Sequence, residues 1–217
     1  MSQPPRPTVL LTGFDPFGDH VLNPSWLAVQ ALHGRQILGH RVVAAQLPTV
    51  FDESRRVLAA LIRRHKPSLV LCVGQAGGRH AISLERVAIN VNDAPMADNA
   101  GAQPIDTPVV KNGPPAYFTS LPIKAMQRAL RDEGIAAEIS QTAGTFVCNH
   151  VFYALMHQLA SGRGLKKVRG GFVHVPFLPE QGEPSMALDE MVRGLRLVVR
   201  SALSTPLDTA TGADPSA

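Results

Sequence analysis

Cys148 is the residue in this sequence that is best placed to act as a nucleophile. From Cys148 to Leu159, apolar residues recur at the spacing of an amphipathic helix, which places the thiol in the first turn. Free backbone N–H groups and the helix dipole favour negative charge there, and the thiolate is the nucleophilic form of cysteine. Residues 136–145 indicate a preceding strand and a tight turn. The alternative is a buried, inert cysteine, because Cys148 shares a helix face with apolar residues.

His174 and Glu85 could supply the other two groups of a cysteine hydrolase. His174 lies near the end of the apolar segment 169–175, where the strands of an open α/β sheet border a ligand crevice. In the segment 83–91, apolar residues alternate in phase with Glu85, which predicts a strand with this carboxylate on the buried face. A buried carboxylate needs a partner, because removing it from water is costly. The alternatives are a core or surface histidine and, with the register shifted by one residue, a solvated glutamate.

Together these residues predict acyl transfer through a covalent intermediate. His174 would take the proton of Cys148 and later give a proton to the leaving amine. Glu85 would orient the imidazole and stabilise its positive charge. The backbone N–H groups of Val147 and Cys148 would bind the oxyanion.

No metal or cofactor site is predicted. His150 and His157 lie seven residues apart, and the sequence has neither an HExxH nor a CxxC pattern, so zinc binding is not supported. The segment Gly74–Arg79 is rich in glycine. It lacks the Lys-Ser/Thr ending of a phosphate-binding loop and the spacing of a dinucleotide fingerprint.

The remaining segments alternate between apolar strands and amphipathic helices, which predicts an α/β fold. Strands are expected at 8–12, 41–46, 68–74, 83–91, 136–139 and 169–175, and helices at 23–32, 51–65, 123–133, 148–159 and 185–203. Continuously apolar strands are typical of parallel strands that are covered on both faces. The proline-rich segment 94–122 is expected to form a long loop that acts as a lid, a rim or an interface arm.

Length and composition predict one domain. A chain of 217 residues fits a single domain over 8–203, with flexible ends at 1–7 and 204–217. The sequence has no signal-peptide pattern and no apolar run long enough to cross a membrane, so a cytoplasmic protein without a membrane partner is expected. The net charge of +4 comes with no nucleic-acid motif, so no nucleic-acid partner is predicted. Cys72, the second cysteine, lies in an apolar strand and is expected to be an unpaired core thiol.

Four blocks of the sequence resemble the pyroglutamyl peptidase I family, also called pyrrolidone-carboxylate peptidases. They are 11–17 (LTGFDPF) with 23–25 (NPS), 85–91 (ERVAINV), 142–149 (TAGTFVCN) and 171–179 (GFVHVPFLP). The resemblance implies a three-layer α/β/α sandwich of the phosphorylase/hydrolase-like fold, with a mixed, mostly parallel sheet, assembled as a homo-oligomer (tetramer or dimer). It also implies cofactor-free removal of an N-terminal pyroglutamyl residue from small peptides. The family's catalytic triad falls on Cys148, His174 and Glu85.

The resemblance also indicates which residues would bind the pyroglutamyl ring. This ring is a flat lactam with apolar faces, one N–H and one C=O, so its pocket needs aromatic walls and a few polar groups. Phe14 and Phe17 could form the walls, next to Val147. Asn23 and Gln75 could contact the lactam edge through side chain or backbone. The alternatives are loop packing for the two phenylalanines and helix capping for Asn23.

One position departs from the resemblance. Many members carry an arginine after the run that corresponds to Asn92-Asp-Ala, whereas this chain continues with Pro95 and Met96. Because the triad is intact, altered rate or specificity is expected. The alternatives are a pyroglutamate-binding homologue with weak or no turnover and a nucleoside phosphorylase-like enzyme, since a fold does not fix a function.

Overall fold

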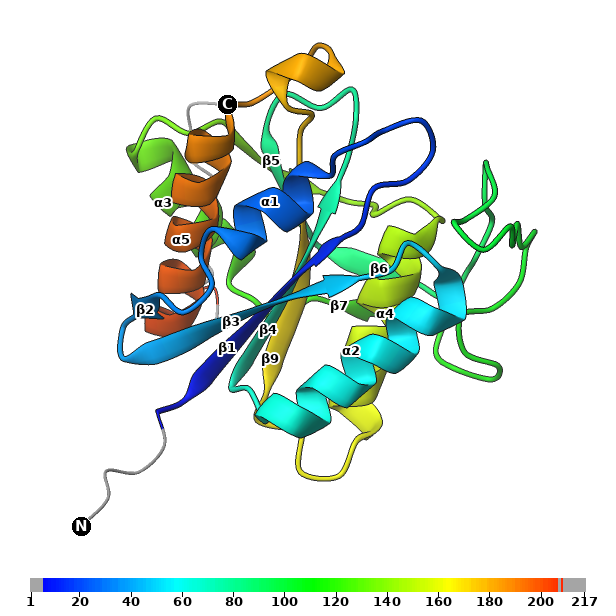
Figure 1. Ribbon diagram of the computed structural model, residues 1–217. Coiled ribbons are helices and arrows are strands. Elements are labelled where there is room, and N and C mark those ends of the chain that lie inside the picture. Colours follow the sequence, from blue (N-terminus) through cyan, green and yellow to red (C-terminus); the bar gives the residue numbers. More distant parts are fainter. Residues whose placement is uncertain (1–5, 207, 209–217) are drawn as a thin grey trace, which may run out of the picture.

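A seven-stranded sheet runs through the centre of the computed structural model, which describes residues 6–206 and 208 (Figure 1). In spatial order its strands are β2 (Gln36–Ile37), β3 (His40–Leu47), β1 (Thr8–Phe14), β4 (Leu69–Gln75), β9 (Arg169–Val175), β5 (Ile82–Glu85) and β8 (Ala137–Ser140). Strands β3, β1, β4 and β9 run parallel, β2 and β5 run against their neighbours β3 and β9, and β8 is parallel to β5. The prediction of a mixed, mostly parallel sheet is confirmed.

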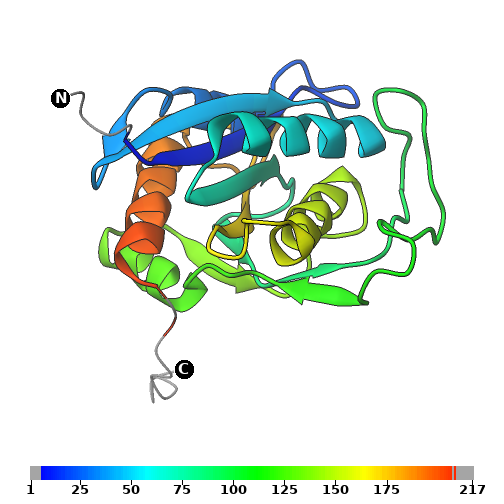
Figure 2. The same ribbon diagram turned by 90° about the horizontal axis from the view of Figure 1, so that it is seen from below.

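Helices cover both faces of this sheet (Figures 1 and 2). One face carries α1 (Pro24–Gln30), α3 (Ile123–Asp132) and α5 (Leu188–Ser204), and the other carries α2 (Phe51–His65) and α4 (Val147–Ser161). Along β4, Leu71 and Val73 point into the core beneath α1, α3 and α5, and Val70 and Cys72 point into the core beneath α2 and α4. Successive strand residues point to opposite faces, so a strand buried on both faces must be apolar throughout. The predicted three-layer α/β/α sandwich is confirmed.

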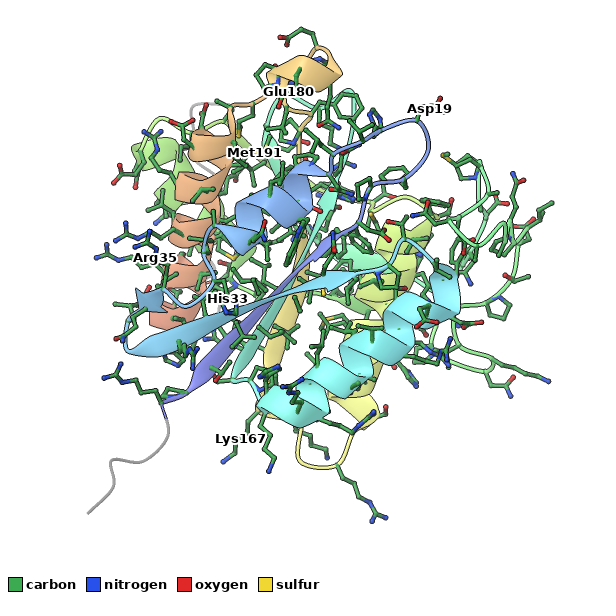
Figure 3. All side chains as sticks on the ribbon, viewed as in Figure 1. Asp19, His33, Arg35, Lys167, Glu180 and Met191 are labelled. Atoms are coloured by element: carbon green, nitrogen blue, oxygen red, sulfur yellow. The ribbon has the colours of Figure 1, made fainter. Side chains whose placement is uncertain are left out.

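The carboxyl ends of the parallel strands β1, β4 and β9 share one edge of the sheet. The segment 15–22 extends beyond this edge with Asp19 near its tip, and Glu180 in the 3-10 turn Pro179–Gln181 lies at the same end of the molecule (Figure 3). Lys167 lies at the opposite end (Figure 3). The loops that could hold a ligand therefore gather at one end, as the topology of an open α/β sheet requires.

The segment 83–91 differs from the single strand that the sequence predicts. Strand β5 ends at Glu85, and β6 (Val87–Ile89) pairs instead with β7 (Ala116–Phe118) in a separate two-stranded sheet. Arg86 makes the crossover, because its N–H donates to Ser140 O and its carbonyl accepts from Thr119 N–H. The alternation of apolar residues therefore continues across two sheets.

Two other predicted boundaries also differ. The final helix begins at Leu188 and not at Ser185, because Ser185 and Met186 pair with Phe177. The long segment 94–122 contains β7 and is fastened to the body of the domain. In it, the carboxylate of Asp98 accepts a hydrogen bond of 3.0 Å from the N–H of Phe51 at the start of α2.

The ends of the chain belong partly to the fold. Ser204, where a flexible tail is predicted to begin, is the last residue of α5. Asp208 accepts hydrogen bonds of 3.0 Å from the N–H groups of Lys124 and Ala125, in the first turn of α3, where the helix dipole favours a carboxylate. The rest of the predicted flexible ends, 1–5, 207 and 209–217, lies outside the described residues. No helix in the described part of the chain is long and apolar enough to cross a membrane.

Gly194 lets α5 approach the sheet, and its replacement tests this packing. A Cβ at Gly194 would lie 2.3 Å from Ile82 Cδ1, although alanine is intrinsically about 1 kcal/mol better than glycine within a helix. Overpacking costs typically 1–3 kcal/mol, so Gly194→Ala should lower the free energy of unfolding. Arg193→Ala, at an exposed position of the same helix, should change it by less than about 0.5 kcal/mol. Urea unfolding measures both, and stabilisation by Gly194→Ala would contradict the packing described.

Candidate active site

Cys148 is the second residue of α4 and lies against the end of β4. Strand β8, a turn with Gly144 in the left-handed conformation (φ +75°), and α4 present the thiol as the sequence predicts. A Cβ on Gly74 would lie 2.8 Å from Cys148 Sγ, so the sulfur occupies the space that a side chain at this position would fill. Gly74 is the register partner of His174 on β9. The thiol and the imidazole therefore belong to the same face of the sheet.

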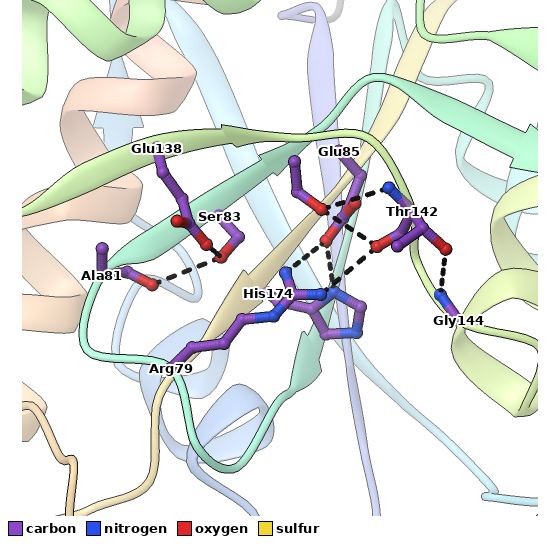
Figure 4. Close-up of polar contacts among 9 residues, drawn as sticks. Arg79, Ala81, Ser83, Glu85, Glu138, Thr142, Gly144 and His174 are labelled. Atoms are coloured by element: carbon purple, nitrogen blue, oxygen red, sulfur yellow. Dashed lines mark hydrogen bonds and ion pairs between the residues drawn. The ribbon is translucent and has the colours of Figure 1, made fainter.

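Glu85 and His174 form a buried hydrogen-bonded pair. His174 Nδ1 lies 2.7 Å from Glu85 Oε1, and the two side chains are 4% and 0% exposed. Arg79 donates to the same oxygen from Nη1 at 2.8 Å, and from Nη2 to Thr142 O at 3.3 Å. Figure 4 shows Arg79 and His174 converging on the carboxylate of Glu85. Because Nδ1 faces this carboxylate, the Nε2 atom of His174 is left for proton exchange with a substrate or a thiol.

Glu85 stays ionised in spite of its burial. Burial opposes the charged form, but the hydrogen bond and charge of His174 and the hydrogen bonds of Ser140 and Arg79 outweigh it, so the pKa of the Glu85 carboxyl is lowered. The second oxygen, Oε2, has no partner among the described residues. Ser140 lies beside Glu85 on the neighbouring strand β8, and its hydroxyl hydrogen can rotate between this carboxylate and Thr142 O, which is 2.9 Å away.

The Cys148 thiol is neutral at rest, which differs from the easily ionised thiol that a helix start predicts. Burial raises its pKa to about 12, and the negative charge of Glu85 adds to this effect, whereas the charge of Arg79 opposes it. Loss of hydration at this half-buried sulfur outweighs the helix dipole. No hydrogen bond joins Cys148 and His174 among the described residues. Such catalytic contacts often shorten only when substrate binds.

The start of α4 offers two free N–H groups beside the sulfur. Among the described residues, neither Val147 nor Cys148 donates its backbone N–H to another group. The side chain of Val147 is fully buried, so only its backbone could contact a ligand. Asn149 holds this turn in place, since its side chain donates to the carbonyls of Ile89 and Val91 at 2.9 Å and accepts from Ile89 N–H.

The two phenylalanines of the first loop have different surroundings. Phe14 is 2% exposed and packs in the core against Phe172, with ring centres 6.4 Å apart. Phe17 is half-buried, and its ring centre lies 6.0 Å from that of Phe146, the residue just before α4. Phe17 and Phe146 are therefore the aromatic pair nearest to the start of α4 that keeps exposed surface.

Asn23 and Gln75 support the loops of this edge through their side chains. Asn23 caps α1, accepting from Ser25 N–H at 3.1 Å, and donates to Asp15 O at 2.9 Å. Gln75 follows Gly74 in β4, so its side chain points to the opposite face from Cys148. There its Oε1 accepts from Gln181 Nε2 at 3.2 Å. Only the backbone of Gln75 therefore lies on the side of the thiol.

Sequence reasoning does not single out Arg79 or Phe146. A signal for Arg79 exists, because a buried Glu85 requires a cation and Arg79 precedes it by six residues. Phe146 could be found as the aromatic residue directly before the predicted helix. The guanidinium of Arg79 is engaged by Glu85 and Thr142 O, so it is not free to bind a phosphate.

His150 lies two residues after Cys148 in α4 and is not part of this set. It is 1% exposed, and its Nδ1 lies 3.0 Å from Asn92 Oδ1. Burial lowers its pKa to about 4, so it is neutral near pH 7. Among the described residues, its Nε2 has no partner.

The chain is similar to known proteins over nearly its whole length. The model of the pyroglutamyl peptidase family matches residues 7–205. The pyrrolidone-carboxylate peptidase of Cupriavidus taiwanensis is 58% identical over 207 residues, which are 93% of this chain and 95% of the relative. That of Bacillus cytotoxicus is 52% identical over 206 residues, again 93% and 95%. The crystal structure of pyroglutamyl peptidase I from Bacillus amyloliquefaciens superposes with a TM-score of 0.92 at 46% identity, covering 95% of this chain and 100% of that one.

The buried neutral His150 should make stability depend on pH. Its folded pKa of about 4 lies below the ordinary value of 6.5, so the unfolded chain binds more protons between these values. His150 therefore leaves the free energy of unfolding unchanged above about pH 6.5 and lowers it by up to about 3 kcal/mol as the pH drops to 4. His150→Gln should flatten this decline, whereas His80→Gln, at an exposed position, should leave it unchanged. Urea unfolding at several pH values measures the slope, and an equal slope in His150→Gln would disprove the assignment.

Proposed function

The chain belongs to the pyroglutamyl peptidase family of cysteine-type hydrolases, and on this premise we propose that it removes an N-terminal pyroglutamyl residue from small peptides by means of Cys148, His174 and Glu85. The observation that carries the proposal is the buried Glu85–His174 pair, 2.7 Å apart, on the sheet face where Cys148 Sγ lies beside Gly74. A nucleophile, a base and a group that orients the base are the parts that covalent acyl transfer needs.

In the first half of the reaction, His174 Nε2 takes the proton of the Cys148 thiol as Sγ attacks the carbonyl carbon of the pyroglutamyl residue. A thiol whose pKa is about 12 needs such a base, because very little thiolate exists near pH 7. The oxyanion accepts hydrogen bonds from the free N–H groups of Val147 and Cys148. His174 then gives its proton to the leaving amine nitrogen, the C–N bond breaks, and a thioester remains on Cys148.

In the second half, water takes the place of the thiol. His174 removes a proton from the water as its oxygen attacks the thioester carbonyl, and the oxyanion returns to the same N–H groups. The C–S bond breaks, free pyroglutamate leaves, and Cys148 recovers a proton from His174. Throughout, Glu85 holds Nδ1 of His174 and stabilises the imidazolium while it exists.

The surroundings suit an uncharged, flat ring. Phe17 and Phe146 offer aromatic surface next to the start of α4, and the backbone near Gln75 can serve the lactam edge. Asn23 supports the site indirectly, because its side chain holds Asp15 and with it the loop that carries Phe17. A blocked amino terminus carries no charge, so recognition needs no carboxylate. Assembly as a dimer or tetramer stays a prediction, which light scattering in solution can measure.

The direct test is release of aminomethylcoumarin from its pyroglutamyl derivative by the purified protein and by Cys148→Ser. Wild type should hydrolyse this substrate, and Cys148→Ser should lose at least about 10³-fold in kcat, because the serine hydroxyl ionises much less readily than the thiol. The matched control is Cys72→Ala, which removes the other, fully buried thiol and should keep the activity.

Substrate analogues separate the alternatives. Prolyl-aminomethylcoumarin has the ring but not its carbonyl, so it should be a poor substrate. Tight binding of pyroglutamate without turnover by well-folded wild type would identify a binding protein instead. Phosphate-dependent release of a base from a nucleoside would point to a nucleoside phosphorylase-like enzyme.

Gly74→Ala tests the contact between β4 and the sulfur. The added Cβ would lie 2.8 Å from Cys148 Sγ and 2.9 Å from Phe172 Cζ, so the thiol must move away from its position. A displacement on the order of 1 Å can cost about 10²-fold in rate, and kcat/KM should fall by about this factor. Thermal unfolding should confirm that the variant folds. Undiminished kcat/KM in a folded variant would show that the sulfur reacts from elsewhere.

A further inference from the structure

We propose that Arg79 is a positioning residue that fixes the carboxylate of Glu85 and offsets its charge toward His174 and Cys148. The inference rests on the proposed function of this site. It adds to the proposed nucleophile and base a residue that acts on them through Glu85.

The geometry of Arg79 is that of a clamp between two segments. Nη1 donates to Glu85 Oε1 at 2.8 Å, and Nη2 donates to Thr142 O at 3.3 Å. Glu85 ends β5, and Thr142 lies in the turn that leads from β8 to Cys148. One planar guanidinium therefore ties the carboxylate to the turn that presents the nucleophile, which a lysine with a single point charge cannot reproduce in full.

Arg79 also shares its acceptor atom with the base. Oε1 of Glu85 lies 2.7 Å from His174 Nδ1 and 2.8 Å from Arg79 Nη1, while Oε2 has no partner among the described residues. The negative charge of a fully buried carboxylate favours the imidazolium form of a neighbouring imidazole. The same charge disfavours the thiolate form of a neighbouring thiol. Both effects would hinder a histidine that must be neutral to accept the proton of Cys148. A cation on the same oxygen reduces both.

The electrostatics of the thiol agree with this role. The charge of Glu85 raises the pKa of Cys148 and the charge of Arg79 lowers it. The Arg79 side chain is 26% exposed, so solvent weakens its effect only in part. The other titratable groups around the site are Cys72 on β4, Glu138 on β8, which accepts from Ser83, and His150 on α4, which bonds to Asn92.

The test compares Arg79→Met, Arg79→Lys and the matched control Arg128→Met, which removes a cation from the exposed face of α3. One readout is the pH dependence of kcat/KM for the pyroglutamyl substrate. The other needs no substrate: the rate of alkylation of Cys148 by iodoacetamide at a fixed pH below the pKa of this thiol, with mass spectrometry to separate Cys148 from Cys72. Removal of a nearby cation makes protonation easier, so Arg79→Met should move the acidic limb of kcat/KM upward by about one pH unit and slow the alkylation about tenfold.

Arg79→Lys should restore most of this shift, because the charge remains, but should keep a several-fold lower kcat, because the bond to Thr142 O is lost. Arg128→Met should change neither readout. A lower rate at every pH without a shift would reduce Arg79 to a structural residue and overturn the proposal. So would an equal shift in Arg79→Lys.

Arg79→Met could misfold, because it removes the cation that pairs with the buried Glu85. A second pair of variants therefore tests the charge effect without a buried, unpaired carboxylate. Glu85→Gln leaves the cation uncompensated and should raise the alkylation rate of Cys148. Adding Arg79→Met to Glu85→Gln should lower this rate again, and equal rates would refute the charge effect. If wild type fails to hydrolyse the pyroglutamyl substrate, the proposed function falls, while the alkylation rates still decide the role of Arg79.

Discussion

A single buried carboxylate oxygen organises this site. Glu85 Oε1 accepts from both His174 and Arg79, and the side chain of Glu85 is fully buried. A carboxylate in such a place is stable only if its charge is matched, because desolvation of an unpaired ion costs far more than one hydrogen bond returns. The strand ends and the turn before α4 must therefore bring a histidine and an arginine to the same atom. The fold of this edge of the sheet meets that requirement.

The two-residue period of the strands decides which side chains meet at this carboxylate. Gly74 and His174 are register partners, so they share the face that α4 covers. The next residues, Gln75 and Val175, are also partners and point to the opposite face. A shift of one residue between the two strands would place a valine where His174 lies beside Gly74. Full burial of the strands on both faces prevents such a shift, so the core that stabilises the sheet also fixes the geometry of the site.

Sequence periodicity predicts the parts of the site that depend on local structure. Cys148 at a helix start and His174 at a strand end follow from the spacing of apolar residues alone. The alternation that predicts the burial of Glu85 spans two sheets, since the chain passes at Arg86 from β5 to β6, which pairs with β7. The cap of Asn23 on α1 is local as well, and it is the alternative that the sequence offers for this residue. The pairing of Arg79 with Glu85 and the aromatic pair Phe17–Phe146 do not follow from this reasoning. Both depend on contacts between segments that periodicity within one segment does not encode.

The resting state of the thiol follows from a competition between two local effects. The helix start favours a thiolate, whereas burial and the charge of Glu85 favour the neutral form, and the latter prevail. A neutral thiol is a weak nucleophile and a poor target for oxidants. In the proposed mechanism it becomes reactive when His174 takes its proton, and the free N–H groups of Val147 and Cys148 promote this step by binding the oxyanion that forms. The same burial that silences the sulfur at rest strengthens these hydrogen bonds during the reaction, because water no longer competes for them. Low reactivity toward solvent and strong stabilisation of the bound intermediate therefore have one physical origin.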